Sequence, residues 1–131
     1  MILVDSSVWI DYFNGTDNPP ADYLYNNLGR EVFVTGDLIM VEVLQGFGSD
    51  RDYATGRKTL ESLPFFNLCG KEIAIAASEN YRKLRKRGIT INKTIDVVIA
   101  TFCIENWIRL LHNDRDFLPL QELAGLEVVG V

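Results

Sequence analysis

Acidic side chains occupy several positions where the surrounding sequence is apolar. Asp5 directly follows Ile2–Val4, an aliphatic run that is typical of a buried strand. Glu42 is the one charge past the first turn of an apolar predicted helix, and Asp96 lies in the first turn of another. Asp114 follows a further apolar run that predicts a strand. Because a buried carboxylate is costly unless it faces a crevice or a cation, these four acids are candidate site residues.

Each acid also has an ordinary structural explanation. Asp5 or Asp114 could cap the helix that follows it, because a carboxylate accepts from the first free amides of a helix. Asp96 could be a first-turn acid that the helix dipole favours. Glu42 could point outward from a half-buried helix.

The joint pattern is harder to explain residue by residue. Acids at the ends of parallel strands gather at one edge of the sheet, and an acid at a helix start can reach the same edge. Carboxylates within ~6 Å of one another repel and raise one another's pKa. They become stable neighbours when a hard cation such as Mg²⁺ or Mn²⁺ binds them. Such a site orients a phosphate and lowers the pKa of a bound water, so it is suited to phosphodiester hydrolysis.

Strands and helices alternate along the chain around these acids. The hydrophobic periodicity predicts strands over Ile2–Val4, Glu31–Val34, Phe65–Leu68, Ile108–Leu111 and Leu126–Val129. It predicts helices over Ser7–Phe13, Pro20–Leu28, Asp37–Gln45, Asp50–Leu63, Lys71–Lys86, Ile95–Ile104 and Leu118–Leu123. Thr35 is expected to cap the third helix, and Thr94 or Asn92 the sixth. This order predicts a three-layer α/β/α fold, with a mostly parallel sheet of four to five strands and helices on both faces.

Composition narrows the class of protein. The 131 residues are 47% hydrophobic and 24% charged, which predicts one folded domain over residues 1–131. No apolar run is long enough to span a membrane and no signal-peptide layout is present, so a cytoplasmic protein is expected. Two cysteines without a CxxC spacing and a single histidine argue against a zinc site. The net charge of −5 argues mildly against a protein that binds nucleic acid by charge alone, although bound metal would recharge an acidic site. No Walker-type or GxGxxG glycine loop is present, so nucleotide binding is not supported.

Four segments of the chain together resemble the PIN-domain ribonucleases. They are the first strand with Asp5-Ser6-Ser7, then Val41-Glu42-Val43-Leu44-Gln45-Gly46, then Ile95-Asp96-Val97-Val98-Ile99-Ala100, then Leu110-Leu111-His112-Asn113-Asp114-Arg115-Asp116-Phe117. Their size and order are most similar to the VapC-type toxins of bacterial and archaeal toxin–antitoxin pairs. The resemblance covers essentially the whole chain.

The resemblance implies a function and a set of roles. Asp5, Glu42, Asp96 and Asp114 match the family's acidic quartet, with Asp116 beside it. Asp5, Asp96, Asp114 and Asp116 would hold one or two Mg²⁺ or Mn²⁺ ions, directly or through water, and Glu42 and Asp114 would complete the shell or help deprotonate the attacking water. The expected reaction is endonucleolytic hydrolysis of RNA, such as tRNA or rRNA, that leaves a 5′-phosphate and a 3′-hydroxyl. The family also implies a homodimer and a small antitoxin protein that blocks the site.

Residues beside the quartet have supporting roles in this interpretation. Ser7 or Asn113 could hold a ligand or a phosphate by a hydrogen bond. His112 departs from the family, which often has Thr or Ser two residues before the first Asp of the last motif. His112 could be a general base, but a packing or supporting role beside Asp114 is the favoured interpretation.

Cations and aromatic residues have both structural and functional interpretations. Arg82, Arg85 and Arg87 belong to a basic run at a helix end, where the helix dipole favours cations, and they could also hold the RNA backbone. Arg115 could do the same from within the last motif. Aromatic residues at helical spacing are expected in the core or in a dimer contact, namely Trp9, Tyr12, Phe13 and Trp107.

Two other classes of function compete with the nuclease. One is a receiver-type phosphoacceptor domain, which would need paired acids after the first strand and a lysine at the end of a later strand. Asp5 is followed by two serines and no such lysine is present, so this class is disfavoured. The other is a PIN-like interaction module without activity, although all four acids are retained.

Overall fold

Strand β1 (Ile2–Val4) lies at the centre of a four-stranded parallel sheet. It pairs with β2 (Phe33–Gly36) on one side and with β4 (Arg109–Leu111) on the other, and β3 (Phe65–Phe66) extends the sheet beyond β2. The sheet order is therefore β3-β2-β1-β4. This computed structural model describes all residues 1–131. The predicted parallel sheet is confirmed, and every named strand pair in it is parallel.

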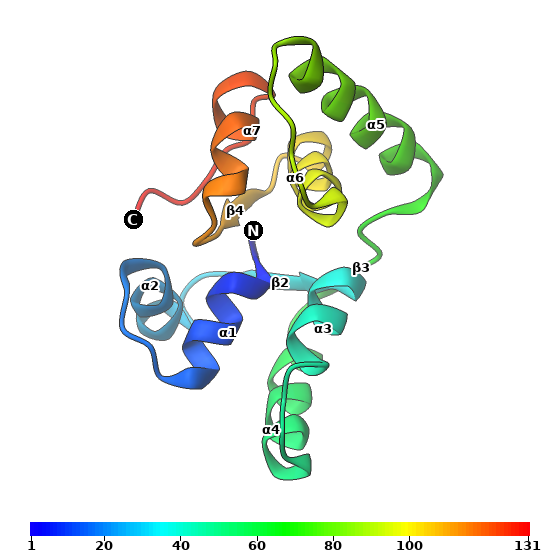
Figure 1. The fold of residues 1–131 in the computed structure, drawn as a ribbon. Coiled ribbons are helices and arrows are strands. Elements are labelled where there is room, and N and C mark those ends of the chain that lie inside the picture. Colours follow the sequence, from blue (N-terminus) through cyan, green and yellow to red (C-terminus); the bar gives the residue numbers. More distant parts are fainter.

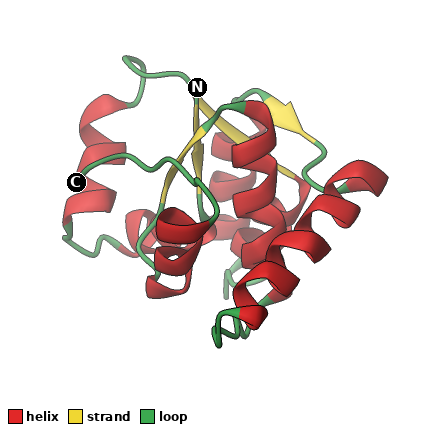
Figure 2. Ribbon diagram, turned by 90° about the horizontal axis from the view of Figure 1, so that it is seen from above, coloured by secondary structure: helices red, strands yellow, loops and turns green.

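Seven α-helices cover both faces of the sheet. They are α1 (Ser6–Asn14), α2 (Pro19–Asn27), α3 (Asp37–Leu44), α4 (Asp50–Glu61), α5 (Gly70–Lys86), α6 (Thr94–Asn106) and α7 (Leu118–Leu123), with a 3₁₀ helix η1 (Arg115–Phe117) before the last. Helices α1 to α4 lie on one side of the strands and α5 to α7 on the other (Figure 1). The view from above shows the short strands enclosed by helices (Figure 2). The predicted α/β/α layering is confirmed, and no helix has the length and apolar character needed to cross a membrane.

The core is built on the central strand. The register places Leu3 opposite Val34 in β2 and Leu110 in β4, and all three side chains are fully buried. Helix α6 is buried over eight consecutive residues, from Asp96 to Cys103, so it packs as an interior helix rather than as an amphipathic surface helix. Because the central strand and most of α6 are buried in the apolar core, the acids at their ends are conspicuous.

The second strand lies further along the chain than predicted. The strand is Phe33–Gly36 rather than Glu31–Val34, so Thr35 is a buried strand residue and does not cap α3. Gly36 holds the cap position, without a side-chain hydrogen bond. A Cβ at Gly36 would lie 2.4 Å from Leu68, so the close packing of Leu68 requires glycine at this turn into α3.

Two further expectations, one about a fifth strand and one about a helix cap, are wrong. Leu126–Val129 is not a strand, because Val128 forms only an isolated bridge to Leu110, and Leu126 donates its amide to Leu120 in α7 instead. Neither Thr94 nor Asn92 caps α6, because Lys93 holds the cap position and makes no capping hydrogen bond. The first and last residues of the remaining elements lie within about two residues of the predicted ones.

Candidate metal centre

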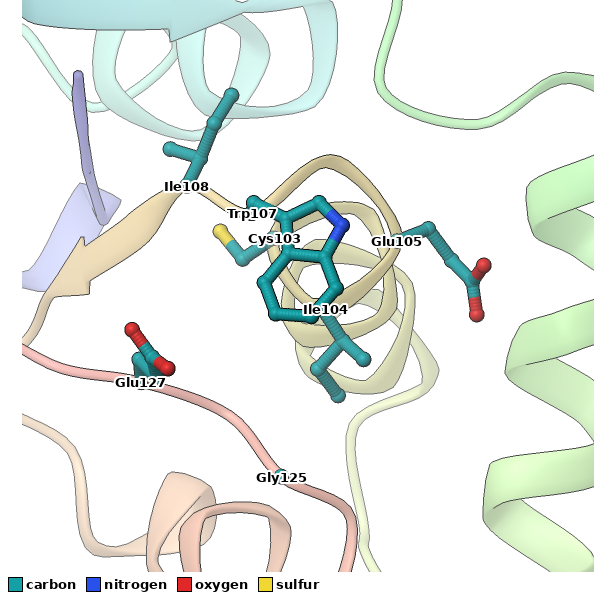
Figure 3. A pocket seen from close by; sticks show the side chains of 7 residues that line it. All are labelled: Cys103, Ile104, Glu105, Trp107, Ile108, Gly125 and Glu127. Carbon is teal, nitrogen blue, oxygen red and sulfur yellow. The ribbon is translucent and has the colours of Figure 1, made fainter.

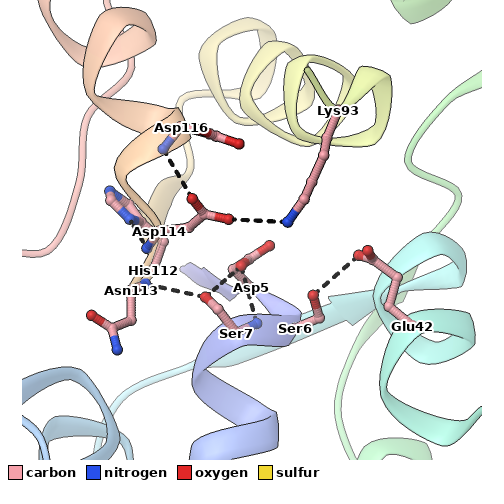
Figure 4. A network of polar contacts seen from close by, with 9 residues as sticks. All are labelled: Asp5, Ser6, Ser7, Glu42, Lys93, His112, Asn113, Asp114 and Asp116. Carbon is pink, nitrogen blue, oxygen red and sulfur yellow. Dashed lines mark hydrogen bonds and ion pairs between the residues drawn. The ribbon is translucent and has the colours of Figure 1, made fainter. Parts of the chain in front are cut away.

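The predicted acidic residues converge at one edge of the sheet. We call them the acidic cluster; they are Asp5, Glu42, Asp96, Asp114 and Asp116. Strands β1 and β4 are parallel neighbours, so their carboxyl ends meet, and Asp5 and Asp114 follow those ends. Helix α3 follows β2 and brings Glu42 to the same edge, and the first turn of α6 brings Asp96. Figure 4 shows Asp5, Asp114 and Glu42 on their separate elements around a common centre.

Asp5 caps helix α1 and is also a candidate site residue. Its Oδ2 atom accepts hydrogen bonds from the backbone amide of Ser7 at 3.1 Å and from the Ser7 hydroxyl. The side chain is only 3% exposed, and its Oδ1 atom is buried without any hydrogen-bond partner. The capping explanation therefore accounts for one oxygen of Asp5 and leaves the other free for a ligand.

Three further carboxylates form the closest group. Asp96, Asp114 and Asp116 each offer an oxygen atom, and these atoms lie within 4.8 Å of one another. Asp96 is 4% exposed, and its Oδ2 atom is buried without a partner. Asp114 caps η1, because its Oδ1 atom accepts the amide of Asp116 at 2.9 Å. This group contains two members of the predicted quartet and the additional acid Asp116.

Glu42 faces the site from the opposite helix layer. Its Oε1 atom accepts a hydrogen bond from the Ser6 hydroxyl at 3.1 Å, which joins α3 to the first turn of α1. The side chain is partly buried, and the hydrogen bond from Ser6 holds it against α1. Ser6 is therefore a contact of the site that the sequence alone does not predict.

The pKa shifts of Asp5, Glu42 and Asp96 indicate that these acids share one electrostatic environment with Asp114. The pKa of Asp96 is raised to about 7, mainly by burial and in addition by the charges of Asp5 and Asp114. Burial also raises the pKa of Asp5 against the hydrogen bonds from Ser7, and Asp114 adds to the rise. The pKa of Glu42 is raised by burial and by Asp5. Carboxylates that raise one another's pKa in this way form a site with an excess of negative charge, which a cation relieves.

Lys93 is a site residue that the sequence analysis missed. Its Nζ atom lies 3.5 Å from Oδ2 of Asp114, and it points into the acidic cluster (Figure 4). The carboxylates of Asp114 and Asp96 raise the pKa of Lys93. One signal was available in the sequence, because a lysine at the start of a helix is opposed by the helix dipole and needs an anion nearby.

His112 supports Asp114 through its backbone. Its Nδ1 atom accepts the amide of Asp114 at 3.2 Å, and its Nε2 atom lies 2.7 Å from Oε1 of Gln121. Nδ1 therefore carries no proton in this arrangement, and Nε2 donates to the glutamine. The ring also packs against Phe117, with 4.8 Å between ring centroids. Both ring nitrogens are occupied, which agrees with the supporting role and not with a general base.

Ser7 and Asn113 connect the first and last motifs. The amide of Asn113 donates to the Ser7 hydroxyl at 3.1 Å, and the Asn113 side chain donates to Asp11 of α1 at 3.2 Å. Both predicted supporting residues therefore hold protein groups in this structure. Their hydrogen bonds fix the loop after β4 against α1, and with it the position of Asp114.

The predicted RNA-binding arginines lie apart from these contacts. Arg82, Arg85 and Arg87 are exposed at the end of α5, and Arg115 is exposed in η1. None of the four forms a hydrogen bond or an ion pair with a carboxylate of the acidic cluster. The structure thus does not place them in the acidic site, and their role in RNA binding stays a prediction.

Trp107 is not a core residue, whereas Trp9 is fully buried. Trp107 ends α6 in the left-handed conformation, with φ of 56°, and its side chain is 89% exposed. It borders a pocket of about 300 Å³ with Ile104, Ile108 and Glu127 (Figure 3). The pocket lies at the opposite end of α6 from Asp96, so it is separate from the acidic cluster.

Comparisons with known proteins agree with this geometry. Residues 2–123 match the family model of the PIN domain. Ribonuclease VapC11 of Mycobacterium tuberculosis is 30% identical over 132 residues, which cover 99% of this chain and 98% of that protein. The chain therefore belongs to the PIN-domain family and, within it, to the VapC ribonucleases. Membership in this family rules out the alternative of a receiver-type phosphoacceptor domain.

Solved structures share the fold at lower sequence identity. VapBC2 from Rickettsia felis, solved bound to a DNA fragment from its promoter, aligns with a TM-score of 0.76 at 14% identity, over 98% of both chains. VapBC-1 from nontypeable Haemophilus influenzae aligns with a TM-score of 0.73 at 20% identity, over 98% of this chain and 97% of that one. At these identities the likeness establishes the fold.

Proposed function

We propose that this chain is the endoribonuclease toxin of a toxin–antitoxin pair and that it hydrolyses RNA at the acidic cluster with a bound divalent cation. One observation carries the proposal above all others. Asp5 Oδ1 and Asp96 Oδ2 are buried carboxylate oxygens without partners, and Asp96 forms one group with Asp114 and Asp116, with an oxygen of each within 4.8 Å of the others. Leaving such atoms unsatisfied costs free energy, and a hard cation satisfies them.

The donor set fits Mg²⁺ or Mn²⁺. All candidate ligands are carboxylate oxygens, which these cations prefer over nitrogen or sulfur. Asp5, Asp96, Asp114 and Asp116 would hold the cation, and Glu42 would complete the surrounding shell. A cation bound there would supply positive charge for the phosphate and lower the pKa of a bound water.

The residues of the chain itself position this chemistry. The amide and hydroxyl of Ser7 hold Oδ2 of Asp5, which fixes the carboxylate and leaves Oδ1 without a partner. The amide of Asp116 orients Asp114 in the same way. Glu42 is held by Ser6 and has a raised pKa, which suits a carboxylate that accepts a proton from water.

The partners follow from the family. The proposed substrate is RNA such as tRNA or rRNA, and the proposed inhibitor is a cognate antitoxin protein, in keeping with the VapBC complexes that share the fold. We further propose a homodimer that acts in the cytoplasm. Arg82, Arg85, Arg87 and Arg115 are proposed to hold the RNA backbone outside the acidic cluster, because phosphate contacts need only cations along the path of the strand.

Sequencing of RNA ends tests the proposal directly. The wild-type protein and Asp96→Asn would be expressed in parallel, and 5′-phosphate ends would be mapped across all cellular RNA. New ends should appear with the wild type and be absent with the variant, whose fold is checked by circular dichroism. Cleavage that persists in Asp96→Asn would refute the assigned site. Absence of new ends with both proteins would favour the interaction module without activity.

A further inference from the structure

Lys93 contacts the one oxygen of Asp114 that the backbone leaves free. Oδ1 of Asp114 accepts the amide of Asp116 at 2.9 Å, and Oδ2 lies 3.5 Å from Nζ of Lys93. This is the only ion pair in the acidic cluster, since the other one in the molecule joins Arg57 to Glu61 on α4. A single cation therefore balances part of a large local negative charge.

The position of Lys93 is not explained by the helix that it precedes. Lys93 is the cap residue of α6 and forms no capping hydrogen bond. The positive end of a helix dipole repels a cation at this place, so the local structure opposes lysine here. The carboxylates of the site are the groups that favour it, and Figure 4 shows its ammonium group pointing between Asp114 and Glu42.

A metal ion and Lys93 would need the same oxygen. The free buried atoms of the site are Oδ1 of Asp5 and Oδ2 of Asp96, and neither has a hydrogen-bond partner from backbone or side chain. A cation that also uses Asp114 would find Oδ2 the more open oxygen, because Oδ1 already accepts an amide. Lys93 can withdraw without loss of core packing, since its side chain is 61% exposed and flexible.

We propose that Lys93 is an internal counter-ion that a divalent cation displaces from Asp114, and that its displaced ammonium group then binds the phosphate of the substrate. This inference rests on the proposed function. A phosphodiester at the site carries negative charge beside the cation, within the region that the lysine side chain already reaches. An ammonium group binds phosphate as a compact charge with three donors, so it needs no fixed geometry to change partners.

The first test measures metal binding without RNA. Mn²⁺ affinity would be determined by titration calorimetry for the wild type, Lys93→Gln, Lys93→Arg and Lys71→Gln. Lys93→Gln should bind Mn²⁺ roughly two- to fivefold more tightly, because the competing ion pair is partly exposed and of modest strength. Lys93→Arg should keep the wild-type affinity. Lys71→Gln removes an exposed lysine from the start of α5 and should also change nothing.

The second test measures phosphate binding by the Mn²⁺-loaded protein. Dimethyl phosphate serves as the probe, and broadening of its ³¹P signal reports binding close to Mn²⁺. Lys93→Gln should weaken this binding roughly tenfold, as expected for loss of one charge-assisted contact. Lys93→Arg and Lys71→Gln should bind dimethyl phosphate as the wild type does.

The outcomes separate this inference from the proposed function. Equal or weaker Mn²⁺ affinity in Lys93→Gln would overturn the competition, and unchanged dimethyl phosphate binding would overturn the phosphate contact. Asp96→Asn serves as the independent reference. If that variant binds Mn²⁺ as tightly as the wild type, the cation is bound elsewhere and the proposed function itself fails.

Discussion

The hydroxyl of Ser7 accepts the backbone amide of Asn113 at 3.1 Å, although 106 residues separate the two in sequence. The same hydroxyl donates to Oδ2 of Asp5. One small side chain thus ties the carboxylate at the end of β1 to the loop that carries Asp114 after β4. The relative position of two acids of the cluster depends on this bridge.

Replacement of Ser7 by alanine should therefore reduce cleavage more than stability. Two hydrogen bonds are lost, which should cost about 1 to 3 kcal/mol of unfolding free energy. Misplacement of Asp5 and of the Asn113 loop should lower metal affinity or RNA cleavage about 10- to 100-fold, as is usual when a group that orients a ligand is removed. Urea unfolding and end-labelled RNA cleavage measure the two effects.

Ser78→Ala is the matched control for this change. Ser78 is an exposed serine of α5 whose hydroxyl donates only to the carbonyl of Ile75 in its own helix. Its removal should leave both stability and cleavage close to those of the wild type. Wild-type cleavage by Ser7→Ala would show that the bridge to Asn113 does not position the site.

The stability of the metal-free protein should depend on Asp96 and on pH. The pKa of Asp96 is 3.8 in its reference state and about 7 in the folded protein, so the folded state holds the proton more tightly. The stabilisation is fully present below about pH 4 and is lost as the pH rises through 7, where a buried carboxylate must ionise. Between pH 4 and pH 8 the loss should amount to roughly 2 to 4 kcal/mol.

Urea unfolding in EDTA at several pH values measures this loss. Asp96→Asn cannot ionise, so its stability should fall less over the same range, with the remaining slope due to Asp5 and Glu42, whose pKa values are also raised. Added Mg²⁺ should remove most of the difference in the wild type, because binding to the folded state alone stabilises it. Equal pH slopes for the two proteins would contradict the shifted pKa.

The sequence predicts the convergence of the acids better than it predicts their supports. Asp5 and Asp114 could be placed together because parallel strands bring their carboxyl ends to one edge, and this follows from hydrophobic pattern alone. The Thr35 cap was wrong because the close approach of Leu68 to Gly36 decides that turn, and Leu68 is distant in sequence. Lys93 was missed for the same reason, since its partner lies on another element.

Neutralising the basic end of α5 should weaken RNA binding without affecting the acidic site. Arg82, Arg85 and Arg87 would be changed together to glutamine in an Asp96→Asn background, so that the RNA is not cut. If all three contact phosphates of single-stranded RNA, the slope of log K against log salt should fall by about 2. Filter binding of bulk tRNA at several salt concentrations measures the slope.

Two cations of α4 provide the control for this experiment. Arg51 and Lys58 are exposed and form no ion pair, and their replacement by glutamine removes charge from a different helix. The slope should then stay near that of the parent. Equal slopes for the α5 variant and the parent would show that these arginines do not contact RNA and only favour the end of the helix.

Substitution of His112 distinguishes a support from a general base. In the structure Nδ1 of His112 accepts the amide of Asp114, two residues along, and asparagine can accept from the same position through its side-chain oxygen. His112→Asn should therefore retain most RNA cleavage, whereas His112→Ala should lose about tenfold or more, because the loop that carries Asp114 is released. Metal affinity should follow the same order, since it depends on the position of Asp114 and not on proton transfer by an imidazole. A general base would give a different result, because both variants would then lose about 10²- to 10⁴-fold in cleavage while binding metal normally.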